Sequence, residues 1–293
     1  MLGAPPHTQG GAVADLCWRH ALCHTTAAHL PSRRVPDAWS GADAYEGYIG
    51  RWSRPVAVAF LDWLALPGGL RWLDVGCGTG ALTAAVLDRC RPEQVTGVDP
   101  SPAYIEWAAS QVVDGRADFQ LGDATTLPGG AVDVVVSGLS INFVPDVPAA
   151  LDAMRNAAPA GTVAAYVWDY ADRMEMLRQF WDAVVTLDPA SRNLDERVRF
   201  PICNPERLEA AWQTAGFANV RTSAIEVPAH FDDFDDLWQP FLAGQGPAPG
   251  YVSSLDVSAR ERLRERLRAQ LPVEPDGAIN LSARAWAVAG QVP

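Results

Sequence analysis

The chain has 293 residues, 48% of them hydrophobic, and a formal net charge of −12 at pH 7. This length suits one sizeable domain, or one domain with an elaborated subdomain, and the hydrophobic content is ordinary for a globular protein. An acidic chain repels phosphate groups, so the composition argues against a dedicated nucleic-acid binder and against binding to anionic membranes.

Cysteine content and hydropathy indicate the cellular compartment in which the protein is expected. The five cysteines are odd in number and scattered along the chain, which fits a reducing cytoplasm better than a disulfide framework. No apolar run approaches the roughly 18 residues of a membrane span, and the N-terminus lacks the basic-then-apolar pattern of a signal peptide. We therefore expect a cytoplasmic protein without membrane contacts.

Residues 1–36 are rich in Pro, Gly, Ala and His without a sustained period, which predicts a poorly ordered extension before a single domain at 37–293. The extension holds a cluster of zinc-ligand residue types, namely Cys17, His20, Cys23, His24 and His29. The cluster lacks the paired, well-separated half-sites of zinc modules, so we predict no metal site.

The next part of the chain alternates between helices and strands. Apolar residues at helical spacing predict a helix at 55–66, which Pro67-Gly68-Gly69 ends. Strands are then expected at 71–75, 95–98, 117–121, 132–137 and 162–168, and helices at 79–89, 102–111 and 148–157. Nearly continuous apolar strands are typical of a parallel sheet covered on both faces, so we predict a doubly wound α/β domain.

The alternation of strands and helices is interrupted after Trp168. A helical insertion is predicted at 169–204. The alternation then resumes with a helix predicted at 205–215 and a strand at 219–227. Residues 228–276 form a second excursion, with an amphipathic helix near 258–271, before a final strand at about 278–288. Taken together, the two excursions are rich in Trp, Phe and Met, so we expect them to form a lid and a pocket.

The most informative segment is a glycine loop between the first strand and its helix. Asp74 ends the strand, and Gly76, Gly78 and Gly80 open the helix. Glycines allow close approach of the backbone to a ligand, and the N–H groups of the helix N-terminus face that ligand. The loop also satisfies the relaxed dinucleotide fingerprint, so the loop alone leaves the ligand open.

Acids at the ends of three consecutive strands narrow this choice. Asp74, Asp99 and Asp123 each follow a strand and should meet at one edge of the sheet. Asp99 also lies where an acid can accept hydrogen bonds from ribose hydroxyls. Three acids disfavour a pyrophosphate and favour a ligand that carries cationic groups.

Four segments resemble, in order and spacing, the motifs of class I S-adenosylmethionine-dependent methyltransferases of the small-molecule, type 11-like branch: 72–80, 97–101, 122–124 and 132–137. The resemblance covers about residues 45–290. It implies S-adenosylmethionine as cofactor, a small-molecule acceptor methylated on O, N or C, and a Rossmann-like, seven-stranded, mostly parallel sheet whose last strand is antiparallel. A non-catalytic cofactor-binding regulatory protein and a dinucleotide-dependent oxidoreductase stay open as alternatives.

The resemblance also implies roles for single residues. Asp74 would bind the methionine ammonium, the three glycines would approach the methionine carboxylate and sulfur, and Asp99 would hold the ribose. Contacts to the adenine would come from Pro100, Ser101, Asp123 and Ala124. Ser137 and Gly138 would lie beside the transferable methyl, and Asn142 and Phe143 would wall the site. An aromatic segment upstream would cap the cofactor through Tyr48, Arg51 and Trp52.

A general base is needed only if the acceptor must lose a proton. The candidates are His230, Asp169 and Tyr170, each near a predicted strand end. The acidic run 231–238 could suggest a divalent metal, but it is predicted to be a solvated loop or a helix start. The arginine-rich segment 258–268 is predicted to be an exposed, ion-paired helix rather than a nucleic-acid site.

Overall fold

A computed structural model describes residues 46–243 and 246–293 of the chain. The predicted extension at 1–36, its Cys/His cluster and Tyr45 lie outside the described residues. Within the described ranges, no helix is both long enough and apolar enough to cross a membrane.

Seven strands form one sheet in the order β3-β2-β1-β4-β5-β7-β6. The parallel strands are β1 (Arg71–Val75), β2 (Gln94–Asp99), β3 (Ala117–Leu121), β4 (Val134–Gly138) and β5 (Thr162–Trp168). The sheet is completed by β6 (Ala218–Phe231) and β7 (Ile279–Gln291), and β7 runs antiparallel to both of its neighbours, β5 and β6. This confirms the predicted Rossmann-like sheet with an antiparallel last strand.

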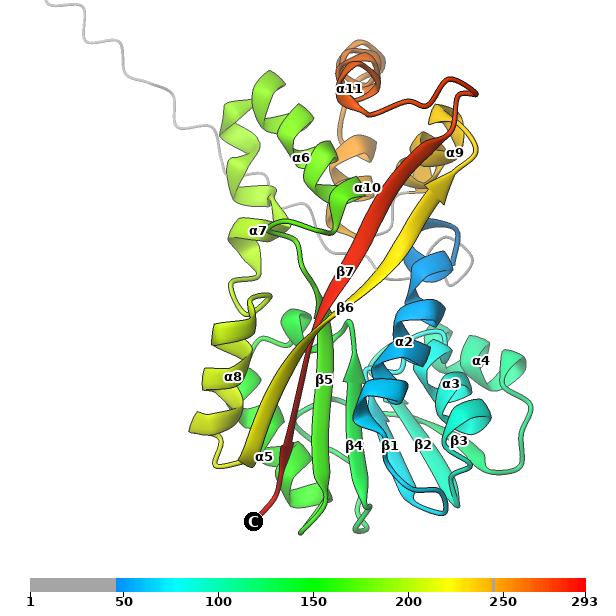
Figure 1. The fold of residues 1–293 in the computed structure, drawn as a ribbon, viewed down its shortest axis with the longest axis vertical. Helices are drawn as coiled ribbons and strands as arrows, with labels where there is room; N and C mark the ends of the chain where they lie inside the picture. Colours follow the sequence, from blue (N-terminus) through cyan, green and yellow to red (C-terminus); the bar gives the residue numbers. More distant parts are fainter. Residues whose placement is uncertain (1–45, 244–245) are drawn as a thin grey trace, which may run out of the picture. The chain divides into compact units, whose positions relative to one another are not determined.

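Helices cover both faces of the sheet (Figure 1). One face carries α2 (Arg51–Leu64), α3 (Ala81–Arg89) and α4 (Pro102–Gln111), and the other carries α5 (Val147–Ala157) and α8 (Pro205–Thr214). Strands β4 and β5 are therefore buried almost along their whole length, which explains their continuous apolar sequences. The strand ends that follow β1, β2 and β4 meet at one edge, and this arrangement positions the site.

Strands β6 and β7 are longer than expected and form a ribbon that continues past the parallel strands (Figure 1). The predicted strand stopped at Val227, before Pro228, but β6 continues through Pro228 to Phe231. Proline is tolerated here because β6 is an edge strand and Pro228 need not donate a ladder hydrogen bond on its open side.

The two excursions lie beyond the carboxyl ends of the parallel strands (Figure 1). The first contains α6 (Glu175–Leu187), η3 (Pro189–Leu194) and α7 (Glu196–Arg199), and the second contains α9 (Phe234–Trp238), η4 (Gln239–Ala243), α10 (Pro247–Ser253) and α11 (Val257–Gln270). Phe180 of α6 stacks on Phe241 of η4 with ring centroids 4.5 Å apart. Asp233 caps α9, which confirms the acidic run as a helix start.

Candidate active site

A pocket of about 410 Å³ opens at the carboxyl ends of the parallel strands. Most of the residues predicted to bind a cofactor line it: Asp74, Gly76, Gly78, Asp99, Pro100, Ser101, Asp123, Ala124, Ser137 and Gly138. They come from the ends of β1, β2, β3 and β4, so the sheet brings together side chains that are far apart in the sequence.

The glycine loop requires glycine for two separate reasons. All three glycines have positive φ, with +73° at Gly76, +54° at Gly78 and +84° at Gly80, a region that other residues rarely adopt. At Gly76 a Cβ atom would also lie 2.2 Å from the Ser140 Oγ. Gly80 does not line the pocket; it is the N-cap of α3.

The N-terminus of α3 faces the pocket, and both Ala81 and Leu82 line it. Gly80 supplies no side-chain hydrogen bond to the first turn. The first N–H groups of a helix lack partners within the helix and carry its positive dipole end. An anionic group placed here would gain hydrogen bonds from N–H groups of this first turn.

Asp74 is 1% exposed, and its two carboxylate oxygens differ. Oδ2 accepts a hydrogen bond of 2.7 Å from the Thr83 hydroxyl of α3, whereas Oδ1 has no hydrogen-bond partner within residues 46–243 and 246–293. The pKa of Asp74 is raised to about 7, mainly by burial and in smaller part by the nearby Asp99 carboxylate, while the hydroxyl and the backbone amide of Thr83 act in the opposite direction. A buried carboxylate with one oxygen unpartnered beside a pocket is suited to bind a cationic donor.

Asp99 bridges two loops of the pocket. Its carboxylate accepts the Gly78 N–H at 3.0 Å and the Ser101 N–H at 2.9 Å, so it fixes the glycine loop against the start of α4. Burial raises its pKa, while these two amides lower it. At the outer end of the pocket Asp123 is exposed, and the Thr125 hydroxyl and amide lower its pKa.

Beyond β4, the short helix η2 (Ile141–Phe143) forms another wall of the pocket. The hydroxyls of Ser137 and Ser140 are 2.7 Å apart, and Ser140 also donates to the Val75 carbonyl at 3.0 Å. These bonds hold η2 against the glycine loop. Asn142 is 8% exposed and does not line the pocket, although its Nδ2 has no hydrogen-bond partner among the residues that the structure describes.

The three predicted capping residues lie outside the pocket lining. Arg51 forms a bidentate pair with Asp236 of α9 at 2.8 and 3.1 Å, and the Trp52 ring packs edge-on against Phe231. Tyr48 is buried against Phe241, and in the described part of the chain its hydroxyl has no hydrogen-bond partner. These residues join α2 to the second excursion.

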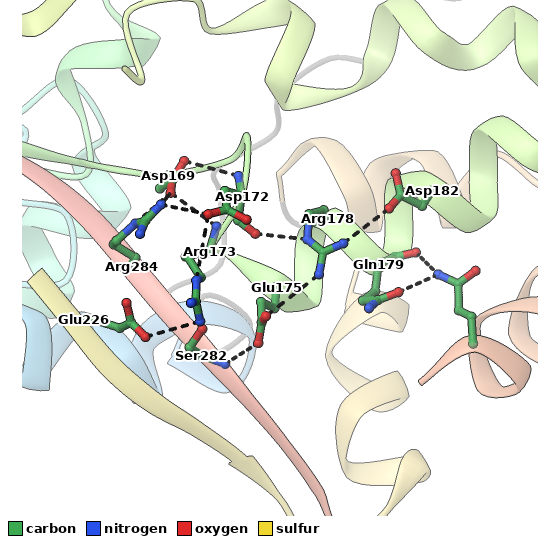
Figure 2. A network of polar contacts seen from close by, with 11 residues as sticks. Asp169, Asp172, Arg173, Glu175, Arg178, Gln179, Asp182, Glu226, Ser282 and Arg284 are labelled. Carbon is green, nitrogen blue, oxygen red and sulfur yellow. Dashed lines mark hydrogen bonds and ion pairs between the residues drawn. The ribbon is translucent and has the colours of Figure 1, made fainter. Parts of the chain in front are cut away.

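The three candidate bases also lie outside the pocket lining. The His230 ring is 2.8 Å from the Asn280 side chain, which is the main cause of its raised pKa, and its side chain is 58% exposed. Asp169 accepts bonds from Arg284 at 2.8 and 2.5 Å and from two backbone amides, as Figure 2 shows. Tyr170 is buried near Phe200.

Asp169 belongs to a network of polar contacts around the end of β5, which Figure 2 shows. Asp169 N donates to the Arg284 carbonyl and Arg284 N donates to the Arg173 carbonyl, so backbone and side chains together tie the end of β5 to β7. Glu175, in the first turn of α6, accepts the Ser282 N–H at 2.8 Å. The network anchors the first excursion on the β6–β7 ribbon.

The sequence reasoning missed several pocket residues, among them Ser53, Ser140 and Tyr166. Ser53 and Tyr166 lie inside regular, mostly apolar elements, so the sequence gives no reason to assign them a role other than packing. No group of three or more His, Cys, Asp or Glu in residues 46–243 and 246–293 could hold a metal ion.

The strand order, the antiparallel β7 and the glycine-lined pocket at the carboxyl edge define a Rossmann-like fold of the methyltransferase type. A family model described as a methyltransferase domain matches residues 45–222. The chain belongs to the class I S-adenosylmethionine-dependent methyltransferases.

Individual relatives differ in what they act on. The 2-methyl-6-phytyl-1,4-hydroquinone methyltransferase of Synechocystis sp. is 30% identical over 67% of this chain, and the match spans 62% of the relative, less than two thirds. The trans-aconitate 2-methyltransferase of Streptomyces avermitilis is 27% identical over 75% of this chain and 84% of its own. A shorter match, 33% identical over 32% of both chains, is to the ribosomal protein L11 methyltransferase of Burkholderia thailandensis.

Among solved structures, the phosphoethanolamine N-methyltransferase 2 of Haemonchus contortus in complex with S-adenosyl-L-methionine superposes with a TM-score of 0.53. It is 17% identical and covers 87% of this chain and 58% of its own. At this identity the likeness concerns the fold.

Proposed function

We propose that this chain transfers the methyl group of S-adenosylmethionine to a small-molecule acceptor. One observation carries the proposal: Asp74 lines a pocket beside the N-terminus of α3, and its buried Oδ1 has no hydrogen-bond partner among the described residues. An amino-acid group carries an ammonium and a carboxylate on one carbon, so it matches an acid and a helix N-terminus placed together. A pyrophosphate has no group for Asp74.

The remaining residues extend this assignment. Asp99 would hold the ribose hydroxyls with the lone pairs that Gly78 and Ser101 leave, and Pro100 and Ser101 would flank the adenine. Asp123 would accept from the adenine amino group, with the Ala124 N–H facing the ring. Ser137 and Gly138 would lie beside the reacting methyl, and η2 would form the wall. Arg51 and Trp52 are left out, because their contacts are with α9 and β6.

S-adenosylmethionine supplies a methyl group on a positively charged sulfur, which makes that methyl reactive toward nucleophiles. The protein has to align the acceptor and exclude water. Since none of the three candidate bases lines the pocket, we propose that alignment contributes more than a dedicated base. Asp169 would serve this alignment indirectly, by fixing the first excursion on β7.

On the side proposed for the acceptor, Phe143 forms the pocket wall, and Phe200 and Tyr170 lie behind it, outside the lining. Phe143 lines the pocket and packs edge-on against Phe200 with centroids 4.8 Å apart, and Phe200 lies 5.8 Å from the Tyr170 ring. Such a wall supports a small, partly apolar or aromatic acceptor.

Shortening Phe143 tests this wall. In Phe143→Ala we expect the acceptor KM to rise by about 5- to 30-fold, the usual effect of losing one aromatic contact, while the Kd of S-adenosylhomocysteine changes little. Phe217→Ala, far along the chain and against Trp212, controls for loss of a buried ring. An unchanged KM with weakened nucleoside binding would instead assign Phe143 to the cofactor.

The pKa of Asp74 predicts how the stability of the protein and its affinity for the ligand depend on pH. The folded-state pKa of about 7 lies above the ordinary 3.8, so the folded protein holds an extra proton between these values. Without ligand, stability should therefore fall as pH rises from about 4 to about 7 and then level off. An ammonium needs the ionised acid, so S-adenosylhomocysteine affinity should rise about tenfold per unit toward pH 7 and then level off.

Calorimetric titrations and thermal melts between pH 5.5 and 8 measure both trends. Asp74→Asn should flatten both curves. A flat affinity profile in the unmodified protein would contradict the assignment of Asp74 as the acid that binds the ammonium.

The function itself is tested with labelled S-adenosylmethionine and an acceptor panel of phenols, amines, carboxylic acids and one protein substrate, with Asp99→Ala as the control. Label transfer to a small molecule supports the proposal. Transfer only to the protein would overturn the acceptor class, and cofactor binding without any transfer would indicate a regulatory binder. Binding of NAD or NADP in place of S-adenosylhomocysteine would indicate an oxidoreductase.

A further inference from the structure

Tyr166 lies on the floor of the pocket without an assigned role. It belongs to β5, it is 2% exposed, and it is among the residues that line the pocket. Its ring packs against Phe60 of α2 with centroids 4.7 Å apart. A tyrosine in a buried strand commonly serves packing alone, so its position relative to the pocket decides what else it does.

The position follows from Gly138. A Cβ atom at Gly138 would lie 2.6 Å from the Tyr166 hydroxyl and 3.1 Å from Leu82 Cδ2 of α3. The hydroxyl therefore sits over β4, next to the first turn of α3. The absence of a side chain at position 138 is what makes room for the ring.

Strand register places Asp74 on the same face. Asp74 pairs with Val136, and Gly138, two residues further along β4, pairs with Tyr166. Paired residues of parallel strands point to the same face, and residues two apart do so as well. The Tyr166 ring thus crosses Gly138 on the face of the sheet that carries Asp74, whose Oδ1 has no partner in the described part of the chain, and α3 begins on this face without a side-chain cap.

We propose that the Tyr166 hydroxyl is a third binding group for the amino-acid end of S-adenosylmethionine, together with Asp74 and the first turn of α3. The inference rests on the proposed function. The hydroxyl donates to the methionine carboxylate, whose charge needs several donors inside a pocket of low polarity. A phenol hydroxyl can donate one bond and accept others, so it can serve the protein and the ligand together.

Two nucleosides separate this role from others. S-adenosylhomocysteine carries the amino-acid end, whereas 5′-methylthioadenosine lacks it. In calorimetric titrations we expect Tyr166→Phe to weaken S-adenosylhomocysteine by about 10- to 100-fold, the usual effect of losing one hydrogen bond to a charged group, and to leave 5′-methylthioadenosine nearly unchanged. The matched control is Tyr251→Phe, because the Tyr251 hydroxyl bonds to Asp188 of the first excursion, outside the pocket lining, and its loss should change neither affinity.

Each other outcome overturns the inference. Equal weakening of both nucleosides would make Tyr166 a packing residue. Unchanged nucleoside affinities with a raised acceptor KM would make it an acceptor contact. If the unmodified protein binds S-adenosylhomocysteine and Tyr166→Phe binds it equally well, the inference fails alone; if the unmodified protein binds neither nucleoside, the proposed function fails with it.

Discussion

Gly76→Ala should remove measurable S-adenosylhomocysteine binding, a loss of about 100-fold or more, while the protein stays folded. The backbone there has φ +73°, which costs a residue with a Cβ about 1–2 kcal/mol. The new Cβ would also meet the Ser140 Oγ at 2.2 Å, and that hydroxyl is held by Ser137 and the Val75 carbonyl. Either the loop or η2 has to move, and both form the pocket.

The effect can be divided with two further variants. Gly69→Ala has a similar φ of +80° but open space around the new Cβ, and it lies outside the pocket lining, so it should lose stability without losing affinity. Adding Ser140→Gly to Gly76→Ala removes the clash and should restore part of the affinity. Equal affinity losses in Gly69→Ala and Gly76→Ala would show that general destabilisation, and not the contact with Ser140, causes the loss.

The second large effect is expected at Asp74. Asp74→Asn keeps the shape and the Thr83 contact but removes the charge, so we expect S-adenosylhomocysteine to bind about 100-fold more weakly or worse, since a buried charge loses its partner. The affinity for 5′-methylthioadenosine, which has no ammonium, should stay within a few-fold.

The same substitution should stabilise the ligand-free protein. At pH 8 Asp74 is ionised although burial has raised its pKa to about 7, so its charge lowers the free energy of unfolding. Removing the charge should therefore raise the free energy of unfolding by about 1–3 kcal/mol. Thermal melts at pH 8 and pH 5 measure this gain, which should shrink at the lower pH. Asp133→Asn, at the other end of the sheet in an exposed pair with Arg71, serves as control. Lower stability of Asp74→Asn at pH 8 would contradict a binding role that costs stability.

Much of the fold could be predicted because its determinants are local. The apolar runs of β4 and β5, the glycine loop and the acids after β1 and β2 are patterns within a few residues, and each marks a buried strand or a strand end. Three such strand ends suffice to predict where the pocket opens.

The rest depends on contacts between distant segments. The pairing of β6 with β7 carries β6 past Pro228, and no signal within β6 indicates the length of its partner. Arg51 meets Asp236 and Asp169 meets Arg284 across more than 100 residues, so neither pair could be predicted from spacing. From the sequence, Tyr166 is predicted to be a core residue. Its proposed role depends on Gly138 of the neighbouring strand, and the sequence around Tyr166 does not indicate that contact.

The most direct test of the site is a calorimetric titration of the unmodified protein with S-adenosylhomocysteine, 5′-methylthioadenosine and NAD at pH 7.5. The proposed cradle predicts micromolar or tighter binding of S-adenosylhomocysteine, clearly weaker binding of 5′-methylthioadenosine, and no binding of NAD. Equal affinity for the two nucleosides, or binding of NAD in their place, would contradict a site built around Asp74 and the N-terminus of α3.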